Sequence, residues 1–174
     1  MIGEKTYIRF APLVRRQRPV LVSLFITGIC NLRCCHCFYG SGERKHDRPE
    51  LTLAEITKIA RTMPSFPWLI LTGGEPFLRP DVFEIASTFQ HYNKLTNLTI
   101  PTHGLKEERV LEFVTQSRTL PAQLQINLNF SIHGPAAIHD TVTGVAGSYE
   151  RTTATIQRAY SLVRQRPNFN LVIS

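Results

Sequence analysis

Apolar and polar residues alternate along the chain with two different periods. Short apolar runs of strand length are followed by longer segments in which apolar residues recur every three or four positions, which is typical of helices packed on one side. A regular alternation of strand and helix predicts an α/β fold with a parallel sheet. The predicted strands are 20–27, 68–72, 96–101, 123–132 and 169–174, and the predicted helices are 52–62, 80–91, 106–117 and 148–165.

Local signals support the predicted starts of three helices. Thr52 and Glu55 have the spacing of a capping box. Pro80 suits the first turn of a helix, and Ser148 is a suitable cap for the last one. The sequence therefore predicts where these helices begin as well as that they exist.

The predicted strand 123–132 alternates strictly, with a polar residue at every second position. If its apolar side packs on outer helices, its polar side lines the inside of a curved sheet, where a ligand can be held. An open antiparallel sheet facing water predicts the same alternation. The helical connections favour the curved sheet. The polar positions are Gln125, Asn127, Asn129 and Ser131.

Length and composition fit one soluble globular domain. The chain has 174 residues, of which 43% are hydrophobic and 19% charged. No apolar stretch reaches the ~20 residues that cross a bilayer, and the charged N-terminal segment lacks the apolar centre of a signal peptide. The sequence predicts a cytoplasmic protein without a membrane span.

A formal net charge of +7 raises the question of an anionic partner. Part of it comes from Arg15, Arg16 and Arg18, which lie in a basic lead-in, residues 1–19. Aromatic residues do not interleave with these arginines, as a single-strand binding surface requires. We therefore interpret the arginines as a solvated lead-in and expect no nucleic-acid partner.

Four cysteines lie within the eight positions 30–37, too close together to link distant parts of a fold by disulfides. Cys30, Cys34 and Cys37 form a Cys-x3-Cys-x2-Cys array directly after the first predicted strand. Three thiolates can hold three irons of a cubane iron–sulfur cluster and leave the fourth iron open to a small molecule. A structural zinc site, with Cys35 or His36 as fourth ligand, is the alternative, although adjacent Cys34 and Cys35 make tetrahedral geometry awkward.

A second motif follows the second predicted strand. Gly73 and Gly74 let the backbone approach a ligand closely, and Glu75 can accept a hydrogen bond from an ammonium group. Such a motif alone is usually an ordinary turn, and only its combination with the cysteine array is diagnostic. His103, after the third strand, is either an acid or base facing a substrate or a polar loop residue.

The cysteine array, Thr72-Gly73-Gly74-Glu75-Pro76 and Ser131-Ile132-His133-Gly134 together resemble the radical S-adenosylmethionine (radical SAM) enzymes, over nearly the whole chain. The resemblance implies a [4Fe-4S] cluster on Cys30, Cys34 and Cys37, with the amino and carboxylate groups of SAM on the open iron. In that family, reductive cleavage of SAM yields methionine and a 5′-deoxyadenosyl radical, which abstracts a hydrogen atom from the substrate.

The resemblance also implies further site residues. Gly73, Gly74 and Glu75 match the site of the SAM amino group, Thr102 is a candidate contact to SAM, and Ser131 matches a contact to its ribose or carboxylate. Beside the adenine, the resemblance places the ring of His36 and the backbone of Tyr39.

Residues 139–150 are similar to a segment of the radical SAM enzymes that mature peptides and cofactors, with Thr143 in place of an arginine. The replacement implies either weaker SAM binding or compensation by Arg151 on the next helix. The substrate implied is a peptide, a cofactor precursor or another small molecule, and the implied electron donor is a flavodoxin or ferredoxin. Five predicted strands, where these enzymes usually have six, imply a partial TIM-like barrel over residues 20–174, a truncated (β/α)6 barrel. A truncated protein that binds cluster and SAM without turnover is the competing hypothesis.

Overall fold

Five parallel strands form one sheet in the order β1-β2-β3-β4-β5. The computed structural model describes residues 18–37 and 49–174, so residues 1–17 of the lead-in lie outside it. Neighbouring strands that run parallel need long crossover connections, which the helices provide. The α/β prediction is confirmed. The strands are β1 (Leu21–Thr27), β2 (Trp68–Gly73), β3 (Asn97–Thr102), β4 (Gln125–Phe130) and β5 (Phe169–Ile173).

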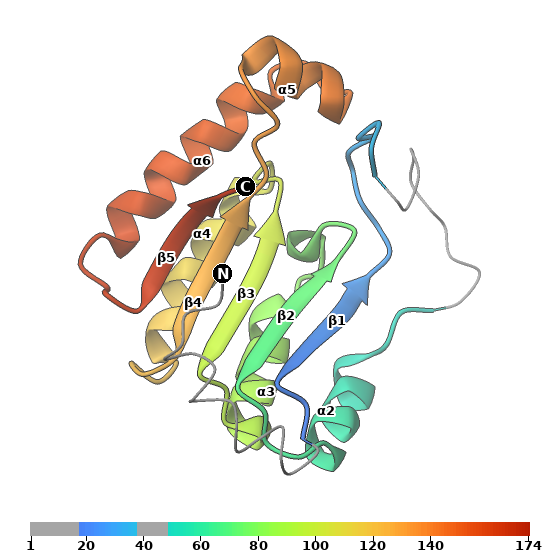
Figure 1. Cartoon of the computed structure of the whole chain (residues 1–174), viewed down its shortest axis with the longest axis vertical. Helices are drawn as coiled ribbons and strands as arrows, with labels where there is room; N and C mark the ends of the chain where they lie inside the picture. Colours follow the sequence, from blue (N-terminus) through green and yellow to red (C-terminus); the bar gives the residue numbers. More distant parts are fainter. Residues whose placement is uncertain (1–17, 38–48) are drawn as a thin grey trace.

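The helices cover one face of the sheet, with α2, α3 and α4 behind the strands and α6 alongside β5 (Figure 1). The four predicted helices are present, with ends shifted by at most two residues. Among the described residues no helix has the length and apolar character to cross a membrane. The helices are α2 (Leu53–Thr62), α3 (Val82–Asn93), α4 (Glu107–Gln116), α5 (Ala136–Thr143) and α6 (Ser148–Val163), with short 3-10 helices η1 (Pro76–Leu78) and η2 (Ser117–Thr119).

The alternation in β4 separates a core face from an open face, as the curved-sheet interpretation expects. Ile126, Leu128 and Phe130 are fully buried beneath the helices, whereas Asn127 and Asn129 on the other face stay partly exposed. Since every strand pair is parallel, the antiparallel alternative is wrong. The fold is a partial TIM-like barrel whose inner face is polar along β4.

Two of the three predicted helix starts are wrong in detail. The capping box of Thr52 and Glu55 is present at α2. Ser148, however, is the first residue inside α6, and the cap position is Gly147, whose φ is 71°. Pro80 lies just before Asp81, the cap of α3, and so precedes the helix that it was expected to start.

Helix α5 was absent from the predicted elements. It has only eight residues, directly after Pro135. It lies beyond the carboxyl ends of the strands (Figure 1). A helix this short carries two turns, too few for an apolar period to stand out in the sequence. Its position places it beside the loops that follow β1 and β4.

Candidate functional site

The cysteine loop and the Gly-Gly-Glu motif are joined through their backbones. Strand β1 pairs with β2, and beyond the strand ends Gly74 N donates to Thr27 O (2.8 Å) and Glu75 N donates to Ile29 O (2.9 Å). These two bonds continue the ladder into the loop that carries Cys30. The distance between the two motifs is therefore set by the sheet itself, because parallel strands end at one edge.

Helix α5 holds the other side of the cysteine loop. Arg33 N donates to Thr143 O (3.1 Å) and Cys35 N donates to Val142 O (3.0 Å). Both acceptors are carbonyls of the last turn of α5, which lack partners inside the helix. Within the loop, Cys37 N donates to Cys34 O (3.0 Å). The loop is thus tied to β2 on one side and to α5 on the other.

The end of α5 is itself fixed to α6 by Asp140. Its carboxylate accepts hydrogen bonds from Gly147 N (2.6 Å), Tyr149 N (2.9 Å) and the Ser148 hydroxyl (2.9 Å). These bonds hold the pKa of Asp140 below its usual value. Thr143 is fully buried, and its hydroxyl contacts that of Ser148 (2.7 Å). Thr143 therefore packs at the α5–α6 corner, and the exposed Arg151 lies on α6.

A pocket of about 250 Å³ gathers the sequence-predicted site residues at the carboxyl ends of the strands. Tyr39 lies outside the described residues. Cys35 is exposed and does not line the pocket. The lining residues proposed from the sequence are Cys30, Cys34, His36, Cys37, Gly73, Gly74, Glu75, Thr102 and Ser131. Thr72, from the same motif, and His103 also line the pocket, and the structure adds Leu32 and Pro101.

The three thiols of the array repel one another when ionised. Burial, followed by the charges of Cys30 and Cys37, raises the pKa of Cys34 to about 11. Burial also raises the pKa of Cys30, with smaller effects from Glu75 and Cys37. Thiolates in such a place need a positively charged partner, and metal binding releases their protons.

The geometry does not suit a single metal ion. In residues 18–37 and 49–174, no three Cys, His, Asp or Glu side chains are close enough together to surround one ion. A zinc site requires four ligands around one point. In a cubane cluster each thiolate binds a different iron, so the sulfurs stand farther apart. The arrangement therefore disfavours the zinc alternative for the described part of the chain.

Glu75 connects the ends of β2 and β3. Its carboxylate, only 1% exposed, accepts hydrogen bonds at both oxygens. Oε1 accepts from Phe77 N (3.1 Å) and from the Thr102 hydroxyl (2.8 Å). Oε2 accepts from His103 N (2.9 Å) and lies 3.2 Å from His103 Nε2. Glu75 and Thr102, both predicted as ligand contacts, are thus also partners of each other.

Three histidines form a row beside the cysteine loop. The rings of His36 and His133 meet edge to face at 4.7 Å, and His133 stacks on His139 at 5.4 Å. His139 Nδ1 accepts from His133 N (3.2 Å), which makes His139 a structural residue of this turn. Burial lowers the pKa of both His133 and His139. The exposed ring of His36 lines the pocket with His133 behind it.

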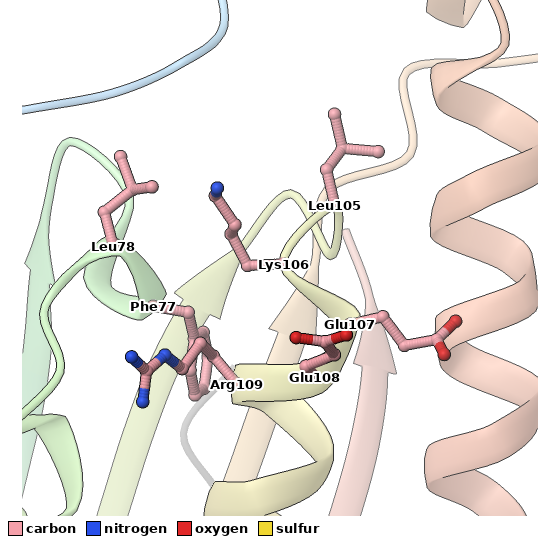
Figure 2. A pocket seen from close by; sticks show the side chains of 7 residues that line it. All are labelled: Phe77, Leu78, Leu105, Lys106, Glu107, Glu108 and Arg109. Atoms are coloured by element: carbon pink, nitrogen blue, oxygen red, sulfur yellow. The ribbon is translucent and has the colours of Figure 1, made fainter.

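A second hollow of about 480 Å³ lies between η1 and the start of α4. Figure 2 shows Leu78 on the η1 side and Lys106 and Leu105 on the turn before α4, with Glu107 directed toward α6. There the Glu107 carboxylate contacts Arg158. The lining contains charges of both signs and neither cysteine nor histidine, so it offers no group for the chemistry expected of the pocket at the strand ends.

A family model and two curated relatives match most of the chain. The family model described as the Radical SAM superfamily matches residues 24–172. The AdoMet-dependent heme synthase of Methanosarcina barkeri is 35% identical over 146 residues, which are 80% of this chain and 38% of that protein. The pre-heme d1 synthase of Dinoroseobacter shibae is 31% identical over 161 residues, 88% of this chain and 37% of that protein. The chain thus spans under two fifths of the length of these relatives.

Among solved structures, the fold is similar to that of SuiB from Streptococcus suis bound to S-adenosylmethionine. The TM-score is 0.63 at 16% sequence identity, and the match covers 91% of this chain and 36% of SuiB. At this identity the similarity concerns the fold. It supports the assignment of the five-stranded sheet as part of a TIM-like barrel.

Proposed function

Since the chain belongs to the radical SAM superfamily, we propose that residues 20–174 bind a [4Fe-4S] cluster and SAM and form the catalytic core of an enzyme. The observation that carries this proposal is that Cys30, Cys34 and Cys37 line the same pocket as Gly73–Glu75. A cluster with one open iron needs three thiolates and, next to them, a place for the ligand of that iron.

The residues present fit these two groups. The array supplies three thiols on one loop, and Cys35, the fourth cysteine, is exposed and does not line the pocket. The buried carboxylate of Glu75 lines the same pocket and is suited to the N–H groups of an amine. The pocket is also lined by Thr102, Ser131 and His36, whose hydroxyls and imidazole suit the polar and aromatic parts of a nucleoside.

The residues of the pocket other than the three cysteines bind or orient SAM. Held by Cys30, Cys34 and Cys37, a reduced cluster would supply the electron for the reductive cleavage of SAM and so for hydrogen abstraction from the substrate. Gly73–Glu75 hold the amino group, Thr102 and Ser131 contact the polar atoms of SAM, and His36 stacks beside the adenine. The barrel orients the reacting groups and excludes water.

We propose a cofactor precursor as the substrate. Two relatives that are more than 30% identical are named for the synthesis of heme or pre-heme d1. Their similarity favours small-molecule maturation over a peptide substrate. The proposed electron donor is a flavodoxin or ferredoxin. The cytoplasm is the proposed compartment, because it keeps thiols reduced.

The proposal predicts that the chain cleaves SAM. After anaerobic reconstitution with iron and sulfide, the protein is incubated with dithionite and SAM, and 5′-deoxyadenosine is measured by chromatography. We expect 5′-deoxyadenosine and methionine in equal amounts. Porphyrin carboxylates, tested beside an unmodified peptide, should raise the rate if the substrate is of the heme type.

The same assay tests the competing hypothesis of binding without turnover. Bound iron and sulfide with no 5′-deoxyadenosine above a protein-free control would favour a binding protein over an enzyme. The Cys35→Ala variant is the matched control, since this cysteine lies outside the pocket. It is expected to cleave SAM like the unmodified chain.

A further inference from the structure

His103 lies where the cysteine loop, the end of β2 and the end of β3 meet. The residue is 7% exposed and lines the pocket. Its ring nitrogen Nε2 lies 2.9 Å from Asn31 Oδ1, next to Cys30, and 3.2 Å from Glu75 Oε2. One imidazole therefore touches both the loop that carries the cysteines and the carboxylate assigned to the ligand's amino group.

The hydrogen bonds of the ring fix its tautomer. Nδ1 accepts from Leu105 N (2.9 Å), so the proton of the neutral ring is on Nε2. Burial, the largest effect, lowers the pKa of His103 and keeps the ring neutral. The Nε2 proton is therefore donated to Asn31 Oδ1, and Glu75 Oε2 lies near the same nitrogen without a hydrogen bond to it.

The backbone of His103 is anchored, so the ring is a fixed reference point. His103 O accepts from the Thr152 hydroxyl (2.7 Å), and Gly104 O accepts from the Thr155 hydroxyl (2.8 Å), both on the buried side of α6. His103 N donates to Glu75 Oε2 (2.9 Å). Because the backbone is tied to α6 and to Glu75, the ring of His103 is a fixed hydrogen-bond partner for Asn31 on the cysteine loop.

We propose that His103 is a positioning residue: its ring holds Asn31 on the cysteine loop, and its backbone N–H holds the Glu75 carboxylate where the amino group of SAM binds. Three hydrogen-bond donors already surround this carboxylate, namely Phe77 N, the Thr102 hydroxyl and His103 N. The ring N–H of His103 does not compete for it, because that N–H donates to Asn31. An amino N–H can therefore donate to Oε2 without leaving a buried N–H unpaired, which would be costly.

This arrangement couples SAM binding to the cysteine loop. His103 bonds Glu75 through its backbone N–H and, through its ring, bonds Asn31, the residue next to Cys30. The position of the carboxylate that receives the amino group and that of the loop that holds the cluster thus depend on the same histidine. The inference rests on the proposed function, because it assigns Glu75 to the amino group of SAM.

A double-mutant cycle tests the coupling. His103→Ala, Asn31→Ala and the double variant are reconstituted, and their affinity for SAM is measured by calorimetry with the cluster oxidised, so that no turnover occurs. Each single change is expected to weaken SAM binding about tenfold, and the double variant should be weaker by about the same tenfold, because the residues act as a pair. His91→Ala, a change of an exposed histidine on α3, is the matched control and should leave the affinity unchanged.

Other outcomes overturn the proposal. Independent effects, with the double variant about a hundredfold weaker, would contradict it, and so would single variants with unchanged affinity. If His103→Ala fails to hold a cluster, His103→Gln decides, because glutamine keeps an N–H donor at similar reach but loses the Nδ1 acceptor. Retained affinity in His103→Gln supports the proposal, and its loss contradicts it. Failure of the unmodified chain to bind cluster or SAM would instead refute the proposed function.

Discussion

Replacement of Cys30, Cys34 or Cys37 by alanine is expected to abolish the visible absorption of the reconstituted cluster, whereas Cys35→Ala leaves it intact. The three array cysteines line one pocket, and Cys35 is exposed outside it. Loss of one thiolate leaves a cubane with two protein ligands, which is too few to hold it. Absorption spectra, with iron and sulfide analysis after gel filtration, measure the effect.

Comparison of the four variants makes the test specific. Cys35→Ala controls for the loss of any thiol from the loop, because it removes sulfur at a position between two array cysteines. Equal loss of colour in all four variants would refute the ligand assignment. One zinc per chain and no colour in the unmodified protein would support the zinc alternative instead.

Gly74→Ala is expected to disrupt the site through the backbone of the cysteine loop. A Cβ at position 74 would lie 2.1 Å from Ile29 O, 2.4 Å from Ile29 C and 3.0 Å from Cys30 N. These are backbone atoms, so rotation of a side chain cannot relieve the clash. The loop has to move away from β2, with loss of the bonds that join the two motifs. We expect a loss of about 3 kcal/mol in unfolding free energy, measured by denaturation, together with a large fall in cluster content.

Gly147→Ala is the matched control for this change. Gly147 has a φ of 71°, but a Cβ there would meet no atom within 4 Å. Its replacement adds backbone strain of about 1 kcal/mol without a clash, and we expect the cluster content to be kept. If Gly74→Ala proves no more harmful than Gly147→Ala, the close contact between the two motifs is not what holds the loop.

The elements and the gathering of the site follow from local patterns in the sequence. The strand periods, the parallel order and the rule that parallel strands end at one edge suffice to bring the loop of Cys30 next to Gly74. The structure adds the register, in which Gly74 N and Glu75 N donate to carbonyls of that loop. The ends of the strands and the chemical groups of the site were therefore predictable, because both depend directly on the residue types in the sequence.

The contacts that orient the loop were less predictable. The carbonyls of Val142 and Thr143 hold the loop through hydrogen bonds between backbone atoms. Such bonds do not depend on the residue type, so the sequence gives no sign of them. Ser148 was assigned to a cap because its residue type is common there, yet a carboxylate from the preceding helix, Asp140, takes that role. The contact of His103 with Asn31 joins residues 72 positions apart and depends on tertiary structure.

The central claim is that three cysteines leave one iron open, and that the amino group of SAM binds it. Electron–nuclear double resonance of the reduced, reconstituted chain with SAM labelled with ¹⁵N at the amino group tests this most directly. We predict a hyperfine coupling between the cluster and the labelled nitrogen. Bound SAM without any such coupling would contradict the claim.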